Sequence, residues 1–317
     1  MKIAVTGGTG FIGRPLVDRL AGAGHQILVL TRHPESAGRA PNVGNGFFDA
    51  MQAPSDGLLD GVDAVIHLAG ESIAKPWSSE QKERILQSRQ KGTEAIARAS
   101  VRAKSVKTLV CASAIGFYGA RGSEELTEDS SPGDDFLARV CRAWEQAASP
   151  ARDAGIRVVH LRNGIVLHPD GGALKKMLLP FRLGIGGRLG SGQQYMSWIH
   201  REDLLSLYTH ALSNESIEGA LNGTAPNPVT NEEFTRVLAR VLHRPALMPA
   251  PAFALKLALG EMSSMVLTGQ RVLPAHALKS GFRPAFAELE PALQNLLGGR
   301  AESLRSGPVA TGAAGRQ

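Results

Sequence analysis

Apolar runs that alternate with helical patterns constrain the fold of this 317-residue chain more than any other feature of its sequence. The runs are rich in Val, Ile and Leu, and they cover residues 2–6, 26–31, 63–69, 107–113 and 156–162. Helical spacing of apolar residues separates them near 12–23, 78–102 and 135–149. Such strands pair in parallel through right-handed crossovers, and continuous apolar runs indicate that both faces are covered. The sequence therefore predicts an α/β fold with a Rossmann-like, doubly wound parallel sheet over residues 1–225.

The regular alternation ends near residue 165, which indicates a second structural region. Residues 168–200 are rich in glycine, and helical patterns return at 203–213, 231–243, 252–267 and 286–297. We predict a smaller C-terminal cap over 226–297, with 168–200 contributing to the substrate side. Residues 298–317 hold almost no large apolar side chains and are predicted to be a disordered tail.

The stretch 253–267 (FALKLALGEMSSMVL) is amphipathic and rich in Leu and Met. We expect it to pack in the core of the cap. Binding of a partner helix or a hydrophobic ligand is the alternative.

Composition and charge exclude several classes of protein. No apolar run reaches the length of about 18 residues that a membrane span needs, and we expect no membrane partner. The net charge of +6 is spread along the chain and aromatic residues make up only 5%, so we expect no nucleic acid. Two cysteines provide neither a disulfide framework nor a metal site, which favours a reducing cytoplasm. A monomer and a homodimer both remain open.

The segment TGGTGFIG at residues 6–13 follows the first predicted strand and opens the first predicted helix. In that context Gly7 permits a tight turn, Gly10 lets the backbone approach a pyrophosphate, and Gly13 lets the helix pack on the strand. The free N–H groups and the helix dipole then attract phosphate. We expect a dinucleotide against this loop, at Gly7, Thr9, Gly10, Phe11, Ile12 and Gly13.

The end of the second predicted strand indicates which dinucleotide binds. An NAD site usually has Asp or Glu there to bind the ribose 2′-OH, whereas this chain has Thr31 and Arg32. A guanidinium attracts a 2′-phosphate that a carboxylate would repel. The sequence therefore predicts NADP(H), with an exposed surface role for Arg32 as the alternative.

Several segments resemble the extended short-chain dehydrogenase/reductase family of nucleotide-sugar epimerases and dehydratases. These are the glycine loop, HLAG at 67–70, SAIGFYG at 113–119 and GSGQQYMSWIHREDL at 190–204. The resemblance implies that Leu68, Ala69 and Gly70 line the cofactor. LAGESI, Trp144–Glu145 and the C-terminal block resemble an atypical branch of NADP-dependent oxidoreductases with a C-terminal domain of unknown function. That resemblance implies an NADP(H)-dependent oxidoreductase acting on a small-molecule substrate.

The usual catalytic pair of that family is missing from this sequence. Family members use a Tyr and, four residues later, a Lys to move a proton while the nicotinamide moves a hydride. None of Tyr118, Tyr195 and Tyr208 is followed by Lys at that spacing. Aligning Trp144–Glu145 with the family's helix puts Leu137 and Cys141 at the two positions. A non-catalytic NADPH-binding sensor or regulator is therefore the alternative function.

Two further substitutions affect charge near the expected ligands. Arg89 replaces the Asn of the family's N-x-x-G-T segment, and Met196 replaces the Arg that holds a sugar diphosphate. The loss of that Arg argues against a nucleotide-sugar substrate. Arg89 is a candidate to contact a cofactor phosphate or an acidic substrate, and a cap or salt bridge on its own helix is the alternative.

Three residues are candidates for catalysis in place of the missing pair. Ser113 ends a predicted parallel strand, where ligands of such sheets bind. Tyr118 is the phenol nearest to it in sequence. Glu71 follows the HLAG segment and would serve as a proton donor if burial raised its pKa. A structural role for Tyr118 and a helix-start role for Glu71 are the alternatives.

Overall fold

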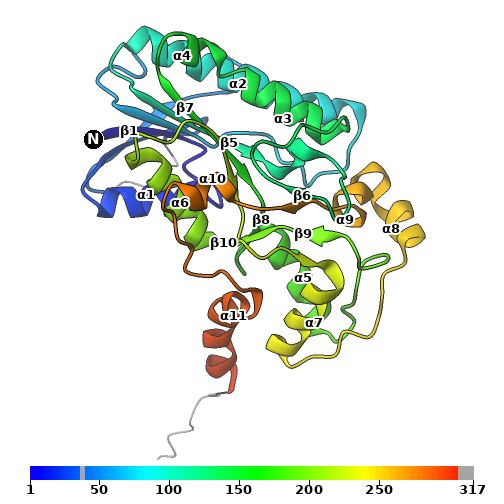
Figure 1. Ribbon diagram of the computed structural model, residues 1–317. Coiled ribbons are helices and arrows are strands. Elements are labelled where there is room, and N and C mark those ends of the chain that lie inside the picture. Colours follow the sequence, from blue (N-terminus) through cyan, green and yellow to red (C-terminus); the bar gives the residue numbers. More distant parts are fainter. Residues whose placement is uncertain (36–39, 306–317) are drawn as a thin grey trace, which may run out of the picture.

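Parallel strands formed from the predicted apolar runs lie at the centre of the molecule (Figure 1). The computed structural model describes residues 1–35 and 40–305. These residues form a seven-stranded sheet in the order β11-β7-β5-β4-β1-β2-β3, in which every neighbouring pair is parallel. The strands are β1 (Lys2–Thr6), β2 (Gln26–Thr31), β3 (Val43–Phe47), β4 (Ala64–His67), β5 (Thr108–Ala114), β7 (Arg157–Asn163) and β11 (Gly219–Gly223).

Helices cover both faces of this sheet (Figure 1). One layer holds α1 (Gly13–Gly22), α6 (Arg201–Ser213) and α10 (Ala275–Lys279), and the other holds α2 (Ser79–Ala103), α3 (Phe136–Gln146) and α4 (Ser149–Asp153). Side chains of β1 alternate between the two cores, with Ile3 and Val5 on the α1 face and Ala4 on the α2 face. This double burial explains why the strands are continuous apolar runs, and the predicted Rossmann-like α/β fold is confirmed.

A third core defines the cap. It joins side chains from β8 to α5 with side chains from α7 and α11, so residues 165–200 pack with the C-terminal part. The cap elements are β8 (Ile165–Leu167), α5 (Gly172–Arg182), β9 (Tyr195–Met196), β10 (Trp198–His200), β12 (Val229–Thr230), α7 (Asn231–Leu242) and α11 (Leu289–Arg305). The buried carboxylate of Asp203 in α6 accepts hydrogen bonds from the N–H groups of Ala285 and Phe286, which ties the C-terminal segment to the sheet domain.

Smaller elements connect the two regions. They are η1 (Ile115–Tyr118), β6 (Glu125–Leu126), α8 (Ala252–Leu259), η2 (Gly260–Ser263), α9 (Ser264–Leu267) and β13 (Arg271–Val272). Helix α8 contributes no buried side chain, so the expectation that this stretch packs in the cap core is wrong for α8. Within the described residues, no helix has the length and hydropathy that crossing a membrane requires.

The last helix continues into the segment that its composition predicts to be disordered. Helix α11 runs to Arg305, eight residues into the segment 298–317 that we expected to be a disordered tail. Residues 306–317, the rest of that segment, lie outside the described residues.

Candidate functional site

The glycine loop between β1 and α1 has the close packing that the motif predicts. Gly7 has φ +68°, and a Cβ there would lie 3.0 Å from the backbone of Leu68 and Ala69. A Cβ on Gly13 would lie 2.1 Å from the Gly7 carbonyl oxygen, so only glycine fits. No side chain caps the N-terminus of α1, so an outside acceptor can approach the N–H groups that precede Arg14, whose own N–H donates to the Gly10 carbonyl oxygen. The chain thus forms a phosphate cradle at residues 7–13.

A buried hydrogen-bond cluster holds the HLAG segment against this cradle. Thr6 Oγ1 accepts hydrogen bonds from the N–H groups of Leu68 (3.1 Å) and Ala69 (3.2 Å). Its own hydroxyl lies 2.7 Å from His67 Nδ1, and we assign the Thr6 O–H as the donor because both amides already donate to its oxygen. Burial lowers the pKa of His67 to about 4, so its ring is neutral. Leu68 and Ala69, predicted cofactor residues, therefore lie beside Gly7.

The end of β2 presents Arg32 to solvent. Thr31 Oγ1 accepts a hydrogen bond from the N–H of His33, so the chain turns directly after the strand. β2 lies next to β1, which places the exposed Arg32 at the same edge of the sheet as the glycine loop. Among the described residues no carboxylate forms an ion pair with Arg32, and its guanidinium can meet an anion from solution.

Phe11 connects the cradle to the segment that we assigned to the substrate side. A Cβ on Gly171 would lie 2.3 Å from the Phe11 ring, so the loop before α5 approaches the ring through its bare backbone. The ring also lies 6.3 Å from that of His168. Residues 168–172 therefore adjoin the glycine loop.

Arg89 extends from α2 to the HLAG turn. Its Nη1 donates to the backbone oxygens of Glu71 (2.9 Å) and Ile85 (3.2 Å), and its guanidinium lies 4.8 Å from the Trp144 ring. A Cβ on Gly70 would lie 3.2 Å from the guanidinium carbon. Burial lowers the pKa of Arg89, and no carboxylate of the described chain lies within ion-pair distance. Arg89 therefore forms no ion pair among the described residues, although it does bond the Ile85 carbonyl of its own helix, and its positive charge lies beside Gly70.

Ser113 belongs to a buried ionic network rather than to an open site. Its hydroxyl donates to Glu145 Oε1 over 2.7 Å, and Arg162 donates to both oxygens of the same carboxylate at 2.9 Å. Ser113 is buried, and its hydroxyl is already used. This arrangement does not favour direct contact between Ser113 and a substrate.

Tyr118 continues the same network and is not a proton donor to a substrate. Its ring is fully buried, its hydroxyl donates to Asn222 Oδ1 over 2.7 Å, and it accepts from Arg162 Nη1 at 2.9 Å. Burial raises the pKa of Tyr118 to about 12. This geometry favours the structural alternative for Tyr118 over a catalytic role.

Glu71 is also unsuited to the role that we considered for it. Its carboxylate accepts hydrogen bonds from Lys75 (2.8 Å) and Gln81 (3.3 Å). The bond from Lys75 lowers the pKa of Glu71, whereas a donor near neutral pH needs a raised one. The pKa of Glu71 is therefore lowered, whereas its role as a proton donor required burial to raise it.

The positions that correspond to the missing pair face the loop after β5. A Cβ on Gly116 would lie 3.3 Å from Leu137 Cβ and 3.8 Å from Cys141 Sγ. Burial raises the pKa of the Cys141 thiol to about 12, which removes it as an acid or base. Met196 is buried in the cap core, and its sulfur accepts from Asn231.

Sequence reasoning missed the residues that support this site from a distance. Thr6, His67, Glu145, Arg162 and Asn222 carry the hydrogen bonds described above. Thr6 and His67 end neighbouring strands, which is the one sequence signal that could have found them.

Comparison with known proteins decides the family. The model of the NAD dependent epimerase/dehydratase family matches residues 3–222. The chain belongs to this family. A second model, for a domain of unknown function (DUF1731), matches residues 250–296.

Similar relatives span almost the whole chain. Epimerase family protein YfhF of Bacillus subtilis is 40% identical over 95% of this chain and 99% of its own. The human epimerase family protein SDR39U1 is 37% identical over 94% of this chain and 100% of its own. The crystal structure of isoform 2 of that human protein with NADPH has a TM-score of 0.84 at 36% identity, covering 93% of this chain and 99% of the other.

More distant structures share the fold of this family member. A UDP-galactose 4-epimerase has a TM-score of 0.75 at 22% identity, with 96% of this chain and 100% of the other covered. At that identity the likeness is one of fold alone.

Proposed function

We propose that the chain binds NADP(H) in the cradle of residues 7–13. The observation that carries this proposal is the packing of Gly13 against Gly7, which has no room for a side chain, as a pyrophosphate-binding glycine turn requires. Arg32, exposed at the end of the neighbouring strand, supplies the charge for a 2′-phosphate. The NADPH in the structure of human SDR39U1 supports the same choice of cofactor.

The residues that would hold the cofactor come from three strand ends. Backbone N–H groups of Thr9, Phe11 and Ile12 in the cradle would hold the phosphates, and Thr31 and Arg32 would hold the adenosine ribose with its 2′-phosphate. The backbone of Leu68, Ala69 and Gly70 follows β4, where Thr6 fixes it. Arg89 adds a positive charge at Gly70.

We further propose an NADP(H)-dependent oxidoreductase that acts on a small substrate without the Tyr/Lys pair. The bound nicotinamide would supply the hydride for reduction, and water would supply the proton that completes the alcohol; oxidation would reverse both transfers. Arg89 would hold the negative charge that develops on the substrate oxygen, since its Nη1 is anchored on two carbonyls and it forms no direct ion pair with a carboxylate of the described residues. Preorganised charge of this kind contributes roughly 100- to 1,000-fold to a rate.

A non-catalytic NADPH sensor remains the second candidate because of one observation. The hydroxyls of Ser113 and Tyr118 and the carboxylate of Glu71 are all engaged by protein partners. A sensor needs the cofactor site alone, and a change in its contacts when the cofactor binds.

Transfer of deuterium from NADPH labelled at C4 to a panel of aldehydes and ketones distinguishes the two candidates. An oxidoreductase yields labelled alcohol, and Arg89→Gln lowers the yield strongly. Arg98→Gln, on the same helix but at an exposed pair with Glu94, serves as the matched control and leaves the yield unchanged. Tight NADPH binding without transfer to any compound would support the sensor, and no binding would contradict both.

The predicted reducing cytoplasm and the choice between monomer and homodimer stay predictions.

A further inference from the structure

Helix α8 lies on the outside of the molecule (Figure 1). Its sequence is AFALKLAL, and none of its eight residues is buried. Phe253 is 75% exposed and Leu257, one turn later, is 89% exposed. Exposing such side chains is unfavourable in water, so a helix that does so is typical of a surface that something else covers.

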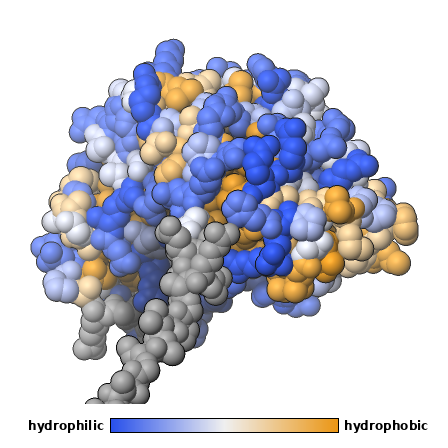
Figure 2. All heavy atoms as spheres, turned by 90° about the horizontal axis from the view of Figure 1, so that it is seen from below, coloured by the Kyte–Doolittle hydropathy of each residue, from blue (hydrophilic) through white to orange (hydrophobic). Residues whose placement is uncertain are grey.

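The exposed apolar surface continues from α8 onto the neighbouring loops. The backbone of residues 186–190 hydrogen-bonds to that of 248–250, which brings the end of α5 beside the segment that leads into α8. We call six exposed side chains of these segments the apolar patch: Leu183, Ile185, Leu247, Met248, Phe253 and Leu257. Apolar surface is visible at the edge of Figure 2 that corresponds to the α8 side of Figure 1.

Positively charged side chains are exposed on the same segments as the apolar patch. On α5, Lys175 and Lys176 lie one turn before the exposed Leu179, so the three share a face of the helix. Lys256 lies one turn after Phe253 on α8. Arg182, Arg188 and Arg244 are exposed on the same two segments.

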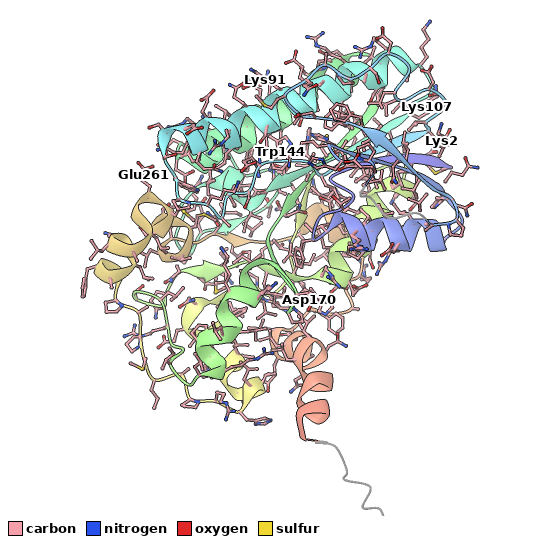
Figure 3. The ribbon with its side chains drawn as sticks, turned by 180° about the vertical axis from the view of Figure 1, so that it is seen from behind. Lys2, Lys91, Lys107, Trp144, Asp170 and Glu261 are labelled. Atoms are coloured by element: carbon pink, nitrogen blue, oxygen red, sulfur yellow. The ribbon has the colours of Figure 1, made fainter. Side chains whose placement is uncertain are left out.

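Negative charge is missing from both segments. Residues 171–201 and 234–260 contain no Asp or Glu at all. The first acid after α8 is Glu261, which lies at the edge of the molecule in Figure 3 and is paired with Lys82 of α2. The two segments therefore combine exposed Phe, Leu, Ile and Met with positive charge and no acidic residue of their own.

We propose that the apolar patch docks on a lipid surface that carries anionic headgroups. Apolar side chains enter the boundary between headgroups and acyl chains, while Lys175, Lys176 and Lys256 stay at the negative headgroups. A second copy of the chain fits less well, because a two-fold contact would place these cations against the same cations. This proposal replaces the expectation of no membrane partner, requires no membrane-spanning segment, and stands independently of the proposed redox function.

Flotation of the full-length protein with vesicles tests the proposal. The protein should float with vesicles of phosphatidylcholine mixed with phosphatidylglycerol, and not with phosphatidylcholine alone. Salt near 1 M should weaken the binding, because the Debye length falls to about 3 Å. Phe253→Asp with Leu257→Asp should lower the partition coefficient at least tenfold, since burial of either side chain is worth about a factor of ten or more.

Two matched variants separate the apolar from the charged contribution. Lys175→Gln with Lys176→Gln should lower binding by roughly fivefold per charge, and only to anionic vesicles. Met51→Asp, which changes another exposed apolar side chain (54% exposed) far from the apolar patch in sequence, should leave binding unchanged. The thermal midpoint of each variant shows that it is folded.

Three results would overturn the proposal. The first is that folded protein does not float with anionic vesicles, and the second is that it floats equally well with the Phe253→Asp, Leu257→Asp variant. The third is that sedimentation shows a dimer that this variant dissolves, which would assign the apolar patch to a second copy instead.

Discussion

Replacing Glu145 with Gln removes the charge that balances Arg162 and keeps the shape of the side chain. The pair is nearly enclosed, with side chains 7% (Arg162) and 13% (Glu145) exposed, and two bonds of 2.9 Å join them. Removing one partner of a buried pair leaves an uncompensated charge and costs about 3–5 kcal/mol. A chain of this length unfolds with an entropy of roughly 0.6 kcal/mol per degree. We therefore expect Glu145→Gln to lower the unfolding midpoint by about 5–8 °C.

Differential scanning calorimetry and urea unfolding measure this loss directly. Glu94→Gln is the matched control, since Glu94 pairs with Arg98 on the exposed surface of α2 and should cost less than about 1 kcal/mol. NADPH affinity should stay within a few-fold of the parent, because the pair does not touch the glycine loop.

The outcome decides whether Ser113 and Tyr118 are structural. A midpoint for Glu145→Gln within a degree of the Glu94→Gln control would refute the account of a stabilising network. Unchanged stability together with lost hydride transfer would instead assign the Ser113–Glu145 pair to catalysis.

Three further predictions concern the cradle, its supporting histidine and the thiols. Gly13→Ala should lower NADPH affinity roughly tenfold or more in a fluorescence titration, because its Cβ would displace the Gly7 carbonyl, whereas Gly22→Ala meets open space and should change nothing. Folding lowers the pKa of His67 from 6.5 to about 4, so the contribution of its neutral ring to the free energy of unfolding should be fully present above pH 6.5 and fall by about 1.4 kcal/mol per pH unit as the pH drops toward 4. Urea unfolding of His67→Gln should show a shallower dependence of that free energy on pH, and an equal dependence would count against a buried neutral His67. Burial raises the pKa of both Cys111 and Cys141, so neither should react with a thiol reagent until the protein unfolds, and rapid labelling of the native protein would contradict this.

The sequence predicts the five inner strands of the sheet, and it misses both edges. β3 (VGNGF) and β11 (GALNG) are glycine-rich and lack the apolar runs of their neighbours. An edge strand has one neighbour and less burial, so pairing with β2 or β7 determines it more than its own composition does. Helix α5 was missed for a related reason, because it begins at glycines and contains Pro180.

In the candidate site, too, the parts formed by neighbouring residues could be predicted and the parts formed by distant residues could not. The glycine loop and the HLAG turn are local in sequence and could be predicted, because a strand, a turn and a helix follow one another directly. The network of Ser113, Glu145, Arg162 and Tyr118 joins residues up to 49 positions apart and carries no local pattern. Sequence alone therefore offered Ser113 and Tyr118 as catalytic residues, whereas tertiary packing occupies their hydroxyls.

Thermal unfolding with NADPH, NADP⁺, NADH and NAD⁺, for the parent and for Arg32→Ala, tests whether the chain binds NADP(H) and whether Arg32 selects it. A ligand at about 100 times its Kd adds about 2.7 kcal/mol, or roughly 4 °C for this chain. We predict stabilisation by NADPH and NADP⁺ over the other two, and a loss of roughly 10- to 100-fold in NADPH affinity when the guanidinium is removed. Equal shifts with all four ligands, or an unchanged preference in Arg32→Ala, would contradict the role of Arg32, and no shift with any of them would contradict the cofactor site itself.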